Sequence, residues 1–143
     1  LVAPTHFPSP RRMAMGLDAN RVSLLLAVIE RKASASFAQH DIYVNIAGGL
    51  QVDEPALDLG IVAAVLSSHR NLPIAHDVAL FGEVGLLGEI RSVSQPDLRA
   101  REAAALGFSR VIVPHSNAGE IRADIDVVPL RRIEEVSGAL FGK

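Results

Sequence analysis

Residues 57–66 constrain the fold more than any other stretch, because almost every side chain in this run is apolar. A helix that is apolar nearly all round offers no face to water, so other elements must cover it. Asp53 is the predicted N-cap of this helix, with Glu54 and Pro55 in its first turn. The sequence therefore predicts a buried central helix.

Length and composition are those of one folded domain. The chain has 143 residues, of which 49% are hydrophobic and 21% charged, and a domain of this size buries roughly two-thirds of its unfolded surface. The lack of cysteine excludes a disulfide framework, a thiolate zinc site and a cysteine nucleophile. Apolar runs stop well short of the ~20 residues of a membrane span. The N-terminus also lacks the basic, apolar and small-residue regions that follow one another in a signal peptide. We therefore expect a cytoplasmic protein without a membrane partner.

Helix and strand patterns alternate along the rest of the chain. Asp18 is predicted to cap a helix that ends near Ser34, and a strand over 41–46 leads into a glycine pair. This alternation indicates an α/β or α+β domain in two layers or more. The other predicted elements are an edge hairpin over 1–16, a strand, glycine turn and strand over 79–91, a helix from a Ser94 and Asp97 capping box to Leu106, strands over 110–114 and 124–130, and a helix over 130–141.

Three patterns that can mark a site have simpler interpretations here. Gly82, Gly85 and Gly88 lie between strand-like segments and open no helix, so a hairpin is favoured over a nucleotide site. Residues 67–69, Ser-Ser-His, fall at a helix end, where adjacent side chains point apart and cannot pair as nucleophile and base. We expect no metal site, because the histidines show no i, i+4 pair: His6, His40, His69, His76 and His115.

Asp58 is the one charged residue that interrupts the central helix near its start. A carboxylate in such an apolar setting must have a hydrogen-bonding or charged partner, or lie at the entrance of a cleft. A structural ion pair is favoured over a functional acid. From the residues alone, the chain is a folded domain without an assembled catalytic group.

Several segments together resemble the proteolytic domain of Lon proteases and, more closely, the Lon-like C-terminal domain of bacterial RadA (Sms) DNA repair proteins. The segments are 41–50, 54–68, 81–91, 99–108 and 111–117, which keep the family's order and spacing. The resemblance implies an α+β, Lon protease-like (ribosomal protein S5 domain 2-like) fold of layered sheets and packed helices. It also implies one domain over 1–143. Because the chain begins with Leu1 and not with Met, we expect a piece of a longer chain, and the resemblance implies that this piece is C-terminal.

The resemblance also identifies two positions where active Lon sites hold their serine and lysine. Here Ala56 stands at the serine position and Asp97 at the lysine position. A methyl group has no lone pair to attack a carbonyl, and a carboxylate reverses the charge that the site needs. We therefore expect no catalytic residues and no peptidase activity in this domain.

The implied parent protein is a RadA-type ATPase with a zinc finger and a RecA-like ATPase domain, acting as a hexameric ring in branch migration during recombination. ATP, Mg²⁺ and zinc are expected only in that parent, because this chain has neither a Gly-x-x-x-x-Gly-Lys-Ser/Thr run nor cysteine. The domain itself would take no cofactor. Its expected partners are further copies of itself in the ring, the ATPase domain of the same chain, and DNA.

DNA contact requires a local basic surface, because the net charge of the chain is −2. Arginine suits phosphate through its planar fork, and binding through such contacts would be weak and independent of sequence. Arg99 could instead form a solvated helix pair with Glu102. The candidate DNA-binding residues are Arg11, Arg12, Arg91, Arg99 and Arg101.

Two other functions stay open at this point. One is a Lon-like serine peptidase with a displaced nucleophile such as Ser94, which a composition with only Lys32 and Lys143 disfavours. The other is a free-standing, peptide-binding pseudoprotease. A Walker A motif and a four-cysteine finger in the same polypeptide would favour the RadA-type parent.

Overall fold

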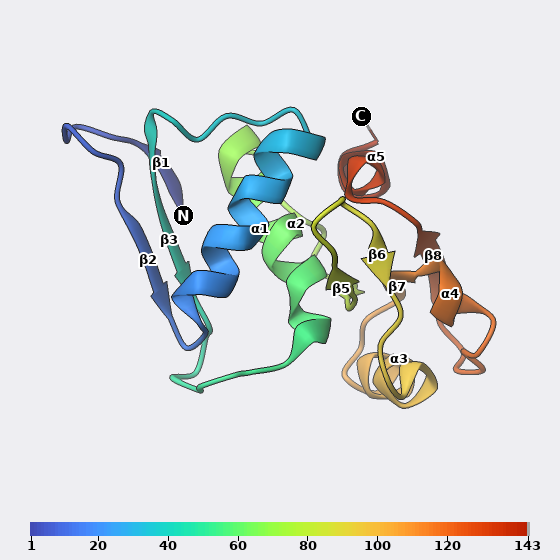
Figure 1. The fold of residues 1–143 in the computed structure, drawn as a ribbon. Helices are drawn as coiled ribbons and strands as arrows, with labels where there is room; N and C mark the ends of the chain where they lie inside the picture. Colours follow the sequence, from blue (N-terminus) through green and yellow to red (C-terminus); the bar gives the residue numbers. More distant parts are fainter. Residues whose placement is uncertain (143) are drawn as a thin grey trace.

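The computed structural model describes residues 1–142 as an α+β fold with two separate three-stranded sheets (Figure 1). The N-terminal sheet has the order β1-β3-β2, and the C-terminal sheet has the order β4-β7-β8 with parallel strands. A short antiparallel ribbon, β5-β6, lies between these two sheets. The strands are β1 (Val2–Pro4), β2 (Arg12–Met15), β3 (His40–Asn45), β4 (Val78–Leu80), β5 (Glu83–Val84), β6 (Ile90–Arg91), β7 (Arg110–Pro114) and β8 (Asp126–Leu130).

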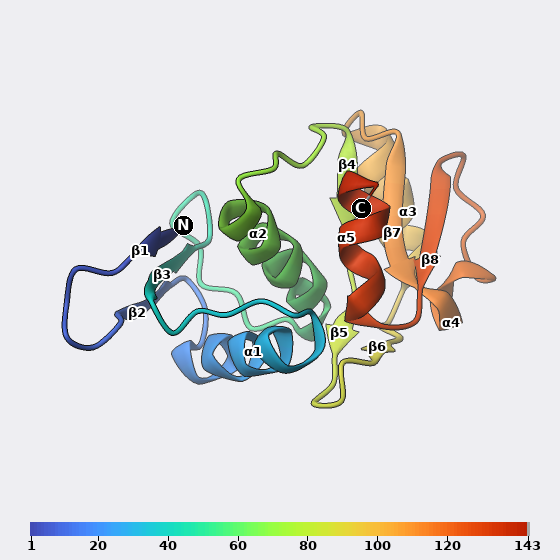
Figure 2. The same cartoon turned by 90° about the horizontal axis from the view of Figure 1, so that it is seen from above.

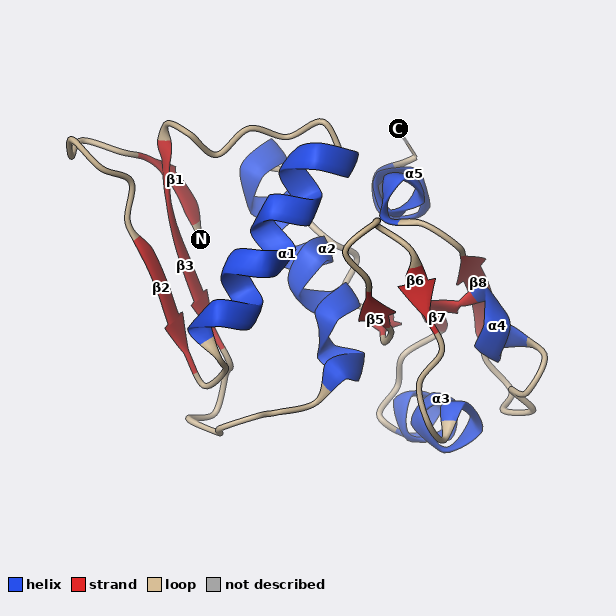
Figure 3. Cartoon of the chain, viewed as in Figure 1, coloured by secondary structure: helices blue, strands red, loops and turns tan. Residues whose placement is uncertain are grey.

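Two long helices lie side by side between the N-terminal sheet and the rest of the molecule, as the two perpendicular views show (Figures 1 and 2). The C-terminal sheet carries helices on opposite sides, with α5 toward α2 and α3 away from it (Figure 2). Figure 3 shows how loops connect these layers. The helices are α1 (Ala19–Lys32), α2 (Asp58–Arg70), α3 (Pro96–Ala105), α4 (His115–Ala118) and α5 (Val136–Phe141), with 3-10 turns at Pro55–Leu57 and Ile133–Glu135.

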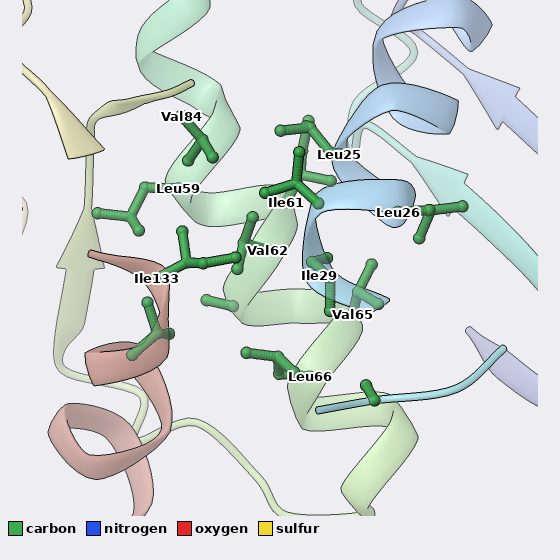
Figure 4. Packing of buried hydrophobic residues seen from close by; sticks show 14 of the residues in the cluster. Leu25, Leu26, Ile29, Leu59, Ile61, Val62, Val65, Leu66, Val84 and Ile133 are labelled. Carbon is green, nitrogen blue, oxygen red and sulfur yellow. The ribbon is translucent and has the colours of Figure 1, made fainter. Parts of the chain in front are cut away.

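The prediction of a buried central helix is confirmed. Leu59, Val62 and Leu66 of α2 are all 0% exposed, and they pack among side chains from α1, β5 and the C-terminal segment (Figure 4). Because α2 is covered on several sides, its apolar residues need not lie on one face. Helix α1 is also confirmed, and Asp18 caps it by accepting a hydrogen bond from Asn20 N at 3.0 Å.

The predicted N-terminal hairpin is wrong. Strands β1 and β2 do not pair with each other: Val2 and Arg12 are both register partners of Ile42, which places β3 between them. Strand β1 runs antiparallel to β3 and β2 runs parallel to it. Pro8 and Pro10 lie in the connection and lack the N–H groups that hairpin pairing needs.

The strand pairing predicted for residues 79–91 is correct only for its second part. The hairpin joins β5 to β6, whereas β4 pairs with β7 in the C-terminal sheet. Gly82 separates the two strands, since its N–H donates to the carbonyl of Ala56 at 2.9 Å and not to a neighbouring strand. The chain therefore leaves one sheet and enters the ribbon at this glycine.

The predicted strands over 110–114 and 124–130 correspond to β7 and β8. The C-terminal helix begins later than predicted, because Leu130 still belongs to β8 and α5 starts at Val136. Glu135 accepts hydrogen bonds from the N–H groups of Arg131 and Arg132 at 3.0 and 2.9 Å, which fixes the turn before the helix. Across residues 1–142, the helices are too short or too polar to cross a bilayer.

Candidate functional site

The segment before α2 occupies the place that the Lon resemblance gives to the nucleophile. The predicted cap Asp53 is wrong: Glu54 is the capping residue, and its Oε1 accepts a hydrogen bond from Ala56 N at 3.1 Å. Pro55 then starts a 3-10 turn that runs into α2 at Asp58. The extra turn moves the α-helical start beyond Asp53, because a proline one residue after Glu54 fits the first position of the turn.

Ala56 lies inside the molecule and not at a surface. Its side chain is 3% exposed and belongs to a buried cluster with Phe81, Ala100 and Val113. Its carbonyl accepts a hydrogen bond from Gly82 N, and the carbonyl of Gly82 accepts one from Leu59 N at 3.0 Å. A methyl group at this position contributes to packing.

Asp97, at the position of the Lon lysine, is tied to backbone groups. Its Oδ1 accepts hydrogen bonds from the N–H groups of Arg122 and Ala123 at 2.7 and 3.0 Å, and Oδ2 pairs with Arg101 Nε at 2.8 Å. The backbone N–H of Arg122 is the largest cause of a lowered pKa for this carboxyl. Asp97 therefore holds the loop before β8 against α3.

The predicted capping box of Ser94 and Asp97 is wrong. Gln95 is the N-cap of α3, in the left-handed conformation with φ of 55°, and it makes no side-chain cap. The carboxylate of Asp97 faces the loop at 122–123 and is not available to Ser94. Ser94 contributes its carbonyl, which accepts a hydrogen bond from Arg99 Nε at 2.8 Å.

Asp58 is 2% exposed and has a structural partner, as predicted. Its two oxygens accept hydrogen bonds from Arg21 on α1, with Nε to Oδ1 at 3.0 Å, and from the N–H of Val84 on β5 at 3.0 Å. Arg21 Nη2 also donates to the carbonyl of Val84 at 3.0 Å. The side-chain hydrogen bond with Asp58 raises the pKa of Arg21. These contacts join α1, α2 and β5 at one point.

A cleft of about 220 Å³ opens beside this ion pair. That volume is below the roughly 300–1,000 Å³ of pockets that bind drug-sized ligands. Carboxylates from four different segments line it together with Arg21, which leaves the cleft acidic. Its charged lining residues are Asp18, Arg21, Asp53, Glu54, Asp58 and Glu83.

Arg11 and Arg12 lie at the start of β2, at the far end of the N-terminal sheet (Figure 1). Arg12 donates to the carbonyls of Phe37 and His40, so its guanidinium closes the turn before β3. The guanidinium of Arg11 instead stacks on the ring of Phe7, with Cζ 3.7 Å from the ring centroid. The two neighbouring arginines thus have different surroundings.

The other three candidate arginines lie on β6 and α3, on the far side of the central helices from Arg11 (Figure 1). Arg91 pairs with Glu83 and Glu89, at 3.8 and 3.3 Å. Arg99 pairs with Glu54 at 3.5 Å, while Arg101 pairs with Asp97. The five predicted residues therefore form two separated groups, and each arginine of the second group has a carboxylate partner.

The structure brings two histidines together that the sequence separates. The rings of His40 and His69 are 5.2 Å apart, and His69 also meets the buried Phe37 edge to face. Burial is the largest cause of a lowered pKa for His69, followed by His40 nearby. Among residues 1–142, no group of three or more His, Cys, Asp or Glu side chains is arranged to hold a metal ion.

Comparison with known proteins places this geometry in a family. Residues 15–117, from the end of β2 to α4, match the family described as subunit ChlI of Mg-chelatase. The chain belongs to the ChlI family. The match spans both the Ala56 segment and the Asp97 segment of this ChlI-family chain.

The ChlI-family chain is also similar to proteins named DNA repair protein RadA. It is 45% identical over 145 residues to the protein of Halalkalibacterium halodurans, covering 100% of this chain and 32% of the relative. It is 45% identical over 142 residues to that of Pseudomonas aeruginosa (99% and 31%), and 50% identical over 117 residues to that of Bacillus subtilis (82% and 26%). The chain spans about a third or less of these relatives and matches their C-terminal part, which confirms the predicted resemblance.

Three residues that organise the surroundings of Asp58 and Arg11 were not predicted from the sequence. Arg21 partners Asp58 across 37 positions, and Asp41 accepts a hydrogen bond from Arg11 N at 2.7 Å. Phe7 places an aromatic ring under the Arg11 guanidinium. For Arg21 a signal existed, since a buried Asp58 demands a cation, but twelve arginines were available to supply it.

Proposed function

We propose that this chain is a non-catalytic, Lon-like scaffold domain of a RadA-type DNA repair ATPase. The observation that carries the proposal is the state of the two Lon positions. Ala56 presents a buried methyl group, and the carboxylate of Asp97 is occupied by two backbone N–H groups and Arg101. Acyl transfer needs a nucleophile within hydrogen-bond reach of a base, and this pair provides neither.

A displaced nucleophile at Ser94 receives little support from the geometry. Its side chain is exposed, and within residues 1–142 its hydroxyl makes no hydrogen bond to a lysine or histidine side chain. A serine without a base is a weak nucleophile. A peptide-binding pseudoprotease is the second alternative, and the acidic cleft beside Asp58 is the place where a basic segment could bind.

In the proposed assembly the domain forms a ring, of six copies, through heterologous contacts in which each copy offers two different faces. The relatives named DNA repair protein RadA support a RadA-type parent chain, because the chain matches their C-terminal part. Elsewhere in the same cytoplasmic polypeptide, the RecA-like ATPase domain would bind ATP and Mg²⁺, and a zinc finger would bind zinc. The domain would add ring closure and weak, sequence-independent contact with DNA.

A peptidase assay tests the non-catalytic role. We expect no casein cleavage and no labelling by a serine-reactive probe for the chain itself or for Ala56→Ser, because Asp97 leaves the new serine without a base. The double variant Ala56→Ser/Asp97→Lys tests whether the geometry retains a usable site, and an active Lon protease is the positive control. Labelling of the unmodified chain would overturn the proposal, and loss of that labelling in Ser94→Ala would then favour the displaced nucleophile.

A further inference from the structure

The loop between β1 and β2, residues 5–11, lies in a segment that carries cationic side chains and no carboxylate. We call it the Phe7 loop. Residues 1–17 contain no Asp or Glu, although the whole chain has 16, and the loop region carries His6, Arg11 and Arg12. The loop projects from the end of the N-terminal sheet, away from the helices (Figures 1 and 2). It is therefore a protruding basic segment on a chain of negative net charge.

Phe7 is the only exposed Phe or Tyr side chain within residues 1–142, at 43% exposure. Burial in the core does not explain an aromatic ring at this position. The guanidinium of Arg11 lies over the ring, with Cζ 3.7 Å from the centroid. A planar cation and an aromatic ring are thus already stacked at the surface.

Hydrogen bonds fix both ends of the Phe7 loop. Thr5 N donates to the carbonyl of Gln39 at 2.9 Å, and Arg11 N donates to Asp41 Oδ1 at 2.7 Å. Asp41 is 5% exposed, and the N–H of Arg11 is the largest cause of its lowered pKa. Pro8 and Pro10 restrict the backbone between these anchors. The ring and the guanidinium are presented with little conformational freedom left to lose on binding.

We propose that the Phe7 loop binds single-stranded DNA, with an unpaired base stacking on the Phe7 ring and Arg11 contributing to that stack and to phosphate binding. This inference rests on the DNA contact of the proposed function and names its site and its preferred strand. Proteins that bind single strands without sequence preference combine cationic grooves with aromatic rings on which bases stack. A duplex keeps its bases paired and stacked, so the ring would gain nothing from it.

Fluorescence anisotropy with a labelled 20-nucleotide single strand and the matching duplex tests this site in the intact chain. Phe7→Ala is expected to weaken single-strand binding about tenfold, while Phe7→Tyr keeps it and duplex binding changes less than about twofold. Arg11→Lys retains the charge but loses the planar stack, so its affinity for the single strand is expected to lie between those of Phe7→Ala and Phe7→Tyr. Leu106→Ala is the matched control, since it removes another exposed apolar side chain, 75% exposed, directly after α3, which lies far from the Phe7 loop (Figure 1).

The Phe7→Trp variant gives a second, direct readout because the chain itself has no tryptophan. We expect the single strand to quench the indole fluorescence of this variant, and the duplex to leave it unchanged. If Phe7→Ala binds the single strand as the parent does and the fluorescence of Phe7→Trp is not quenched, the Phe7 loop is excluded as the binding site. DNA contact elsewhere on the domain, as in the proposed function, is then retained. If the parent chain binds neither strand even at low salt, both this inference and the DNA contact of the proposed function are wrong.

Discussion

Arg21 on α1 and Asp58 on α2 form an ion pair in which the arginine side chain is 36% exposed and the aspartate side chain 2% exposed. The two partners therefore differ in what their loss would leave behind. Without Arg21, a buried carboxylate keeps only the N–H of Val84. Without Asp58, the guanidinium can turn toward water, but the N–H of Val84 loses its acceptor.

We predict that Arg21→Ala lowers the free energy of unfolding by about 3 kcal/mol, because removal of one partner leaves a buried charge uncompensated. Asp58→Ala is expected to cost less, about 1–3 kcal/mol, for the unpaired N–H. Urea unfolding measures both. Arg101→Ala, which breaks the more exposed pair with Asp97, is the control and should cost under about 1 kcal/mol. Equal costs for Arg21→Ala and the control would contradict the structural role of the buried pair.

Stability should depend on pH through His69. Burial lowers its pKa in the folded chain, so between that value and the ordinary value near 6.5 the unfolded chain binds more protons. The free energy of unfolding is therefore expected to fall as pH drops below about 6.5 and to level off below the folded pKa.

Urea unfolding between pH 5 and 8 measures this dependence. His69→Phe removes the titrating group, keeps a ring against Phe37, and should flatten the pH profile in this window. His76→Gln, at an exposed histidine, is the matched control for the loss of an imidazole. An unaltered slope in His69→Phe would show that another group is responsible.

Two glycines should respond to alanine with opposite signs. At Gly82 an added Cβ would lie 3.2 Å from both Ile90 Cγ2 and Pro114 Cγ, so Gly82→Ala is expected to destabilise the fold by about 1–3 kcal/mol. At Gly60, inside α2, an added Cβ meets nothing within 4 Å, so Gly60→Ala is expected to stabilise it by about 0.5–1 kcal/mol. Thermal melts of both variants measure these effects, and a stabilising Gly82→Ala would contradict the close packing of Gly82 against Ile90 and Pro114.

Local patterns could be predicted from the sequence, whereas pairings between distant residues could not. The apolar run around Leu59 and the cap at Asp18 follow from side chains a few positions apart, so both were correct. The pairing of Val2 and Arg12 with the same residue, Ile42, depends on which strands meet in space. Periodicity contains no information on that choice, which is why the N-terminal hairpin was wrong.

In the candidate site, too, local requirements could be predicted from the sequence and contacts between distant residues could not. The need of Asp58 for a partner follows from its apolar surroundings, but the choice of Arg21 among twelve arginines follows from how α1 crosses α2. The stacking of Arg11 on Phe7 depends on a loop whose ends are held by Gln39 and Asp41. Such contacts need the folded structure.

DNA binding by this chain should depend strongly on salt, because phosphate contacts release counterions. We predict that Arg11→Ala/Arg12→Ala weakens binding more than Arg91→Ala/Arg99→Ala, since Arg91 and Arg99 already have carboxylate partners. Anisotropy titrations at low and physiological salt compare the two double variants. A larger loss in the second variant would place the DNA contact on β6 and α3 instead of at the Phe7 loop.

The mass of the assembly tests the scaffold role most directly. Light scattering on the purified chain at micromolar concentration and above should show a ring of about 91 kDa, six copies of the 15.2 kDa chain, because heterologous contacts close only when the full set of copies is present. A single species of 15.2 kDa at every concentration would contradict the claim that this domain itself closes the ring.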